Sequence, residues 1–96
     1  MILKIFIKTE TKYIPYPISQ IARLFEEDPE ITPGLDGDFI ANFKSFFFVY
    51  EAPNKKRGEK LFLGFPRGKR KPQQFEVTGY SHLVVAEFIS IYFNER

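Results

Sequence analysis

The sequence predicts an α+β fold, in which a four-stranded, mainly antiparallel sheet carries two helices on one face. Three observations lead to this prediction: a period-two pattern near the N-terminus, three apolar runs separated by turn residues in the middle of the chain, and helical periodicity in two further segments. A chain of 96 residues can bury one hydrophobic core but not two. We therefore expect residues 1–96 to form a single domain in the order strand, helix, strand, strand, strand, helix.

The first strand and the first helix are expected in the N-terminal third of the chain. Residues 2–9 alternate between apolar side chains on one side and Lys4, Phe6 and Lys8 on the other, which is the pattern of a half-buried strand. Residues 18–27 place apolar side chains at helical spacing, and a proline follows shortly afterwards. The helix is therefore expected to end before that proline.

Three strands of an antiparallel meander are expected in the middle of the chain. Phe43–Glu51 is apolar on both faces and is expected to be the central strand. Lys60–Phe65 and Gln74–Thr78 are expected to be the next two strands, each preceded by turn residues. The acidic segment Ile31–Phe39 and the basic segment Pro66–Pro72 contain proline and glycine, so both are expected to be loops.

The last segment of the chain is expected to be a helix, although its Val and Ile content makes a strand the competing interpretation. Glu87, Ser90 and Asn94 form a polar stripe at helical spacing. Thr78 or Ser81 is expected to cap the start of this helix. The rest of the circumference is apolar, which indicates either deep packing or the interface of a homodimer.

Basic residues are concentrated in one segment. Residues 54–72 contain eight Lys or Arg and one Glu, a net charge of 8 − 1 = +7, whereas the rest of the chain has 6 basic and 11 acidic residues, or −5. A segregation this strong produces a local field that attracts polyanions. The alternative is that the charge run is an ordinary solvated face.

Strand alternation also predicts a sheet face that mixes lysines with aromatic rings. The residues expected to share it are Lys4, Phe6 and Lys8 on the first strand, Lys44, Phe46, Phe48 and Tyr50 on the central strand, and Lys60, Phe62 and Gly64 on the next. Rings of this kind stack on bases while ammonium groups neutralise phosphates. The side chains expected to stack are Phe6, Phe46, Phe48 and Phe62. The alternative is that Phe46, Phe48 and Phe62 belong to the core of a sheet covered on both sides, or of a dimer.

Two basic loops are expected at opposite ends of the strand Lys60–Phe65: residues 53–59 before it and residues 66–72 after it. The strand spans about 20 Å at 3.3 Å per residue. Such loops suit the phosphates of a single strand or of a duplex. Together with the lysines of the mixed face, they give the following predicted nucleic-acid-binding residues: Lys4, Lys8, Lys44, Lys55, Lys56, Arg57, Lys60, Arg67, Lys69, Arg70 and Lys71.

Catalytic machinery has little support in the sequence. His82 is the only histidine and has no carboxylate at a recognisable spacing, so a surface or capping role is expected. Asp36 and Asp38 lack the further ligands of a calcium loop and are expected to lie in a turn. A metal-dependent nuclease built on these two residues, Glu51 and a lysine is a third possibility. The chain has no Cys and no glycine-rich phosphate loop, and we expect no metal and no cofactor.

Three segments resemble parts of two known nucleic-acid-binding families. Residues 4–9 and 44–50 resemble the two aromatic signatures of RNA recognition motif domains, but Ser45 and Phe47 stand where small residues are expected, and the meander stands where that family has its second helix. Residues 61–75 (LFLGFPRGKRKPQQF) are similar to a strand and basic loop of the stage V sporulation protein G family, which binds nucleic acid. Neither resemblance assigns the chain to a family.

The sequence therefore predicts a non-catalytic protein that binds DNA or RNA, with single strands slightly favoured. The rival interpretation is a small protein-interaction module or an inhibitor of a nucleic-acid-handling partner, in which the acidic segment 26–38 imitates phosphate spacing. The N-terminal residues alternate and carry lysines, unlike a signal peptide, and no apolar run reaches the roughly 18 residues of a membrane span. We therefore expect a cytoplasmic protein without a membrane partner.

Overall fold

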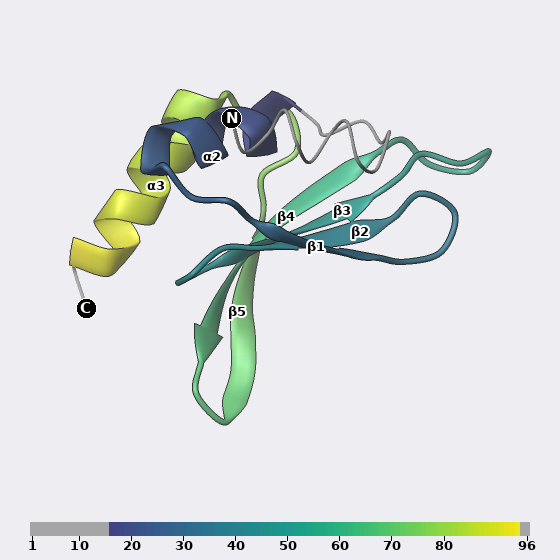
Figure 1. The fold of residues 1–96 in the computed structure, drawn as a ribbon. Coiled ribbons are helices and arrows are strands. Elements are labelled where there is room, and N and C mark those ends of the chain that lie inside the picture. The colour runs from purple at the N-terminus through teal and green to yellow at the C-terminus, as the bar shows by residue number, and fades with distance from the viewer. Residues whose placement is uncertain (1–15, 95–96) are drawn as a thin grey trace. The chain divides into compact units, whose positions relative to one another are not determined.

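The computed structural model in Figure 1 describes residues 16–94 and confirms an α+β fold with two helices and an antiparallel sheet in this part of the chain. The prediction of four strands is wrong, because the sheet has five strands within these residues. The elements are α2 (Tyr16–Phe25), β1 (Glu30–Pro33), β2 (Phe39–Asn42), β3 (Phe47–Glu51), β4 (Lys60–Arg67), β5 (Arg70–Glu76) and α3 (His82–Asn94). They form two compact units, one that contains both helices and one that contains the sheet, residues 29–78. The predicted first strand, residues 2–9, lies outside the described residues.

The sheet is a simple meander in the order β1-β2-β3-β4-β5, in which every neighbouring pair is antiparallel. The prediction that the Phe-rich run forms the central strand is confirmed, because β3 lies in the middle of the sheet. The strand is shorter than predicted, since residues 43–46 form the turn that joins it to β2, with the Phe43 amide donating to the Phe46 carbonyl. Within the described residues, β2, β3 and β4 are therefore paired on both sides, and β1 and β5 are the edge strands.

The prediction of an acidic loop over residues 31–39 holds only for residues 34–38, because residues 31–33 belong to β1 and Phe39 begins β2. Asp36 and Gly37 have φ values of 56° and 92°, and the Asp38 amide donates to the Leu35 carbonyl. Two successive residues with positive φ make a type I′ turn, whose twist suits a tight antiparallel hairpin. The expectation that Asp36 and Asp38 lie at a turn is confirmed.

The register of the strands sorts their side chains into two faces. Phe48 lies opposite both Ala41 and Leu63, and Tyr50 lies opposite Leu61, so these side chains share one face. We call it the core face, because the side chains it carries are buried: Phe39, Ala41, Phe48, Tyr50, Leu61, Leu63 and Phe65. The other face, which we call the open face, carries half-buried or exposed side chains, including Ile40, Phe47, Val49 and Phe62.

An aromatic cluster fills one end of the core face. The rings of Phe43 and Phe46 stack with centroids 4.7 Å apart, and Phe48 meets both of them edge to face at 5.9 and 6.0 Å. Phe48 has no exposed surface. Stacked and edge-to-face pairs of this kind add to the stabilisation that comes from burying the rings. The cluster therefore fixes the turn between β2 and β3 against the centre of the sheet.

In the helical unit, α2 ends in a Schellman motif. The Glu27 amide donates to the Ala22 carbonyl at 3.0 Å, the Glu26 amide donates to the Arg23 carbonyl at 3.3 Å, and Glu26 has a φ of 53°. This left-handed position is the one that glycine usually occupies in such a motif. Any other L-residue is strained there, because its Cβ comes close to the following carbonyl oxygen.

Replacing Glu26 with glycine is expected to raise the free energy of unfolding by about 1 kcal/mol, because it removes the steric penalty of the left-handed backbone. For a chain of this size, thermal unfolding followed by circular dichroism would then shift upward by about 4–8 °C. Glu26→Ala is the matched control, since it removes the same charge and keeps a Cβ. An equal gain from both variants would point to the charge rather than the backbone.

The predicted last helix is confirmed as α3, and Ser81 caps it. The Ser81 hydroxyl accepts from the Val84 amide at 3.3 Å, and the Ser81 carbonyl accepts from the Val85 amide. His82 begins the helix, and its Nδ1 is hydrogen-bonded to the Tyr16 hydroxyl of α2. The predicted polar stripe of this helix is exposed. Neither described helix has the length and apolar character needed to cross a membrane.

Candidate nucleic-acid interface

The hairpin of β4 and β5 extends beyond the rest of the sheet. β3 pairs with β4 only as far as Gly64, so the residues that follow on β4 pair with β5 alone. We call residues 65–73 the arm. The arm is a two-stranded ribbon, and Figure 1 shows it projecting away from the ends of the other strands. All of its residues except Phe65 are exposed.

The prediction of a loop over residues 66–72 is wrong, because only Gly68 and Lys69 lie outside the strands. Gly68 has a φ of 63° at the first position of this two-residue turn, as a type II′ turn requires. Pro66 and Pro72 suggested a loop, yet both fit strands here. Pro66 lies past the end of β3, at a register shift between Phe65 and Arg67, and Pro72 lies on the edge strand.

Four cations cover the end of the arm. Arg67 and Arg70 are cross-strand partners and therefore lie on the same side of the ribbon, Lys69 lies in the turn, and Lys71 follows on β5. The Nε atom of Arg67 donates to the Lys71 carbonyl at 2.9 Å, which holds the guanidinium along the ribbon. Among the described residues, no carboxylate forms an ion pair with any of the four. The positive charge of the arm is therefore not neutralised by these residues.

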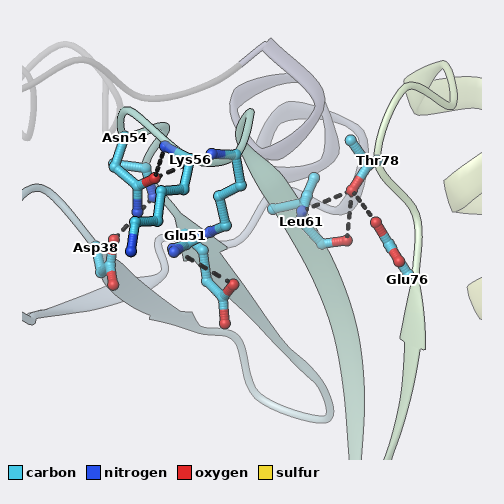
Figure 2. Close-up of polar contacts among 9 residues, drawn as sticks. Asp38, Glu51, Asn54, Lys56, Leu61, Glu76 and Thr78 are labelled. Atoms are coloured by element: carbon cyan, nitrogen blue, oxygen red, sulfur yellow. Dashed lines mark hydrogen bonds and ion pairs between the residues drawn. The ribbon is translucent and has the colours of Figure 1, made fainter.

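The base of the hairpin is held by Thr78, as Figure 2 shows. Its hydroxyl oxygen accepts from the Leu61 amide at 2.9 Å and is 3.0 Å from Oε2 of Glu76. The Val77 amide donates to the Leu61 carbonyl at 2.8 Å. These bonds continue the pairing of β4 and β5 at the end opposite to the arm. The arm therefore projects from a ribbon whose base is fixed.

The basic loop between β3 and β4 is a second, separate cluster of cations. Oδ1 of Asn54 accepts from the backbone amides of Lys56 and Arg57, at 2.7 and 3.0 Å. Figure 2 shows Asn54 beside Lys56 in this loop. This side chain closes the tip and leaves the cationic side chains exposed. The guanidinium of Arg57 is 3.6 Å from Oε1 of Glu51, and both side chains are more than a third exposed. Water screens such a pair strongly.

The antiparallel register places these two clusters at opposite ends of the sheet. β4 has eight residues, so its ends are about 23 Å apart at 3.3 Å per residue. We call the end of the sheet that carries the loop of residues 55–57 the loop end. The β1–β2 turn lies at the same end, because Oδ1 of Asp38 accepts from the Ala52 amide at 2.8 Å. The carboxylates that gather at the loop end are Asp36, Asp38, Glu51 and Glu59. The predicted cations therefore form no single patch, and the arm is the cluster with the least compensation.

The predicted face shared by Phe46, Phe48 and Phe62 is wrong. Phe48 lies opposite Leu63 on the core face, whereas Phe62 lies opposite Val49 on the open face. Phe46 and Phe48 are 3% and 0% exposed, so their rings are not available to stack on bases. The alternation within each strand was predicted correctly, but the register between strands decides which of its two sides is buried.

The open face carries aromatic rings with few cations. Phe62 is half-buried there. The ring of Phe47 lies so close to Gly64 that a Cβ at this position would clash with it. Lys60 is the basic residue of this face, opposite Glu51, while Glu76 lies opposite Phe62. The mixture of rings and acids makes this face a weaker match for phosphates than the arm.

A shallow pocket of about 320 Å³ lies at the loop end of the open face. It is lined by residues of β1, β2, β3 and the β1–β2 turn, among them Thr32, Ile40 and Val49. Its charged lining residues are Asp38 and Glu51. Two carboxylates repel a phosphate, so the pocket gives no support to a nucleic-acid site at this place.

The remaining predicted site residues are dispersed. Lys44 is exposed in the β2–β3 turn, which the register places at the same end of the sheet as the arm. Lys60 is half-buried on the open face. Lys4, Phe6 and Lys8 lie outside the described residues. Reasoning from the sequence missed the arm as a strand pair. The signal that was available is Gly68-Lys69, since a glycine suits the first position of a two-residue hairpin turn.

Comparisons with known proteins assign no family to the chain. No protein-family model matches the chain, and neither the curated proteins nor the solved structures include a significant match.

Proposed function

We propose that the protein binds nucleic acid without catalysing a reaction on it, and that the arm is the main contact. The observation that carries this proposal is the set of four exposed cations, Arg67, Lys69, Arg70 and Lys71, on a projecting ribbon without a carboxylate partner among the described residues. Clustered Lys and Arg neutralise phosphates and release the counterions condensed on them, which supplies most of the affinity of sequence-independent binding. The arm places these four cations close together on an exposed ribbon.

The binding mode that the geometry supports is contact with the phosphate backbone. Stacking of bases on Phe46 and Phe48 is not supported, because both rings are buried. Phe62 is half-buried on a face that also carries acidic side chains. The loop Lys55–Arg57 contributes a second set of cations at the other end of β4, where nearby carboxylates reduce their effect.

Fluorescence anisotropy with labelled oligonucleotides tests the proposal. Four phosphate contacts give a slope of about −3.6 in a plot of log affinity against log salt, at 0.9 per phosphate. Between 50 and 200 mM salt, the affinity is then expected to fall by about 100-fold. Binding that is absent at the lower salt concentration, or that changes little between the two, would overturn the proposal.

A second candidate function, contact with another protein or with a second copy of the chain, is favoured by one observation on α3. Leu83, Val84 and Ile91 are 63%, 51% and 45% exposed, which is unusual for three apolar side chains of one short helix. Light scattering at low and high salt distinguishes the modes of assembly. Association through α3 would persist or strengthen in high salt, whereas pairing of acidic and basic regions would weaken.

A further inference from the structure

The shape of the arm points to a particular class of nucleic acid. Three residues of β4, from Phe65 to Arg67, continue beyond the last residue that β3 pairs, which gives a projection of about 10 Å at 3.3 Å per residue. The major groove of B-form DNA is about 8.5 Å deep and about 12 Å wide, and it admits a two-stranded ribbon. The length of the arm therefore matches the depth of this groove, and its two-stranded form is one that the groove admits.

Other grooves fit the arm less well. The minor groove of B-form DNA is about 6 Å wide, and proteins that open it commonly insert an apolar wedge between base steps. The turn of the arm has Gly68 and Lys69 instead of a wedge, and Pro66 and Pro72 lie further back, at the register shift. Duplex RNA has a deep, narrow major groove that side chains do not reach.

Within the arm, Arg67 is the cation whose side chain is held by a hydrogen bond to the ribbon itself. Its Nε atom is already used by the Lys71 carbonyl, at 2.9 Å, which orients the guanidinium and leaves both Nη groups to donate elsewhere. Two parallel donors of an arginine match O6 and N7 of guanine in the major groove. Lys69, Arg70 and Lys71 are exposed around it and suit the flanking phosphates.

We infer that the arm enters the major groove of double-stranded DNA, with Arg67 at the edge of a guanine and the other three cations on phosphates. This inference rests on the proposed function and adds the substrate class and the groove. It makes Arg67 different from its neighbours, because its contribution depends on a forked donor as well as on a charge.

Chemical probing with dimethyl sulfate tests the inference, since this reagent methylates guanine N7 in the major groove and adenine N3 in the minor groove. The full chain is added to a labelled DNA duplex until anisotropy shows saturation. We expect protection of N7 within the footprint and no protection of N3. We expect Arg67→Lys to keep the affinity within about threefold, because the charge remains, and to lose the N7 protection.

The possible failures are distinguishable. Saturation of the duplex without N7 protection, or with protection of N3, overturns the inference and leaves the proposed function standing. Saturation of single strands or of duplex RNA while duplex DNA stays unbound also overturns the inference and leaves the proposed function standing. N7 protection that Arg67→Lys retains overturns the role of Arg67. Failure of every nucleic acid to bind at low salt overturns the inference and the proposed function together.

Discussion

Replacing Phe48 with alanine is expected to destabilise the protein by about 3–5 kcal/mol, which is the usual loss for a large aromatic side chain in a core. The ring has no exposed surface and contacts Phe43 and Phe46 edge to face, so its removal leaves a cavity in the aromatic cluster of the core face. Small domains have a total stability of about 5–15 kcal/mol, and the variant would retain only part of it. Urea unfolding followed by circular dichroism measures the change in the unfolding midpoint.

Phe47→Ala is the matched control, because the same side chain is truncated one position earlier on the same strand. Phe47 lies on the open face and is half-buried, so its removal is expected to reduce stability by about 1–2 kcal/mol. The difference between the two variants tests the assignment of the core face. A larger loss for Phe47→Ala than for Phe48→Ala would contradict that assignment.

Neutralising the four cations of the arm is expected to lower the affinity for nucleic acid by about 100-fold at low salt, because four phosphate contacts lose their charge. The variant replaces Arg67, Lys69, Arg70 and Lys71 with glutamine. These side chains are exposed and form no ion pair with the described residues, so stability is expected to change by about 0.5 kcal/mol or less. Anisotropy measures the affinity, and circular dichroism checks that the fold is retained.

A variant of the opposite end of β4 provides a control with equal charge. It replaces Lys55, Lys56, Arg57 and Lys60 with glutamine, which also removes four positive charges. Nearby carboxylates already offset part of this charge, including Glu51 at 3.6 Å from Arg57. The expected loss is therefore about tenfold or less. Equal losses from both variants would mean that binding follows the overall charge and has no preferred site on the sheet.

Much of the fold could be predicted from local patterns. The periodicity of the last helix, the cap at Ser81 and the central position of the Phe-rich strand all follow from spacing and composition, and each is present. The hairpin of β1 and β2 was missed, because its strands have only four residues each and the Asp36-Gly37 turn signal was interpreted as a loop. Short strands give too few alternations to reveal a period of two.

The candidate site was harder to predict than the fold. The concentration of cations between residues 54 and 72 is visible in the sequence. Their separation into a loop cluster and an arm depends on where β4 begins and ends and on which strands pair with it. The stacking residues were assigned to the wrong face for a related reason. β3 is apolar on both sides, so its own pattern does not reveal which side faces the core, and the answer comes from its register with Leu63 on β4.

Backbone amide resonances recorded during titration with duplex DNA test the central claim most directly, because they report where on the chain the ligand binds. The account predicts that the largest shifts occur in the arm, at Arg67 and residues 69–71, with smaller changes at the loop of residues 55–57. Large shifts confined to the open face around Phe47 and Phe62, or to α3, with the arm unaffected at saturation, would contradict it.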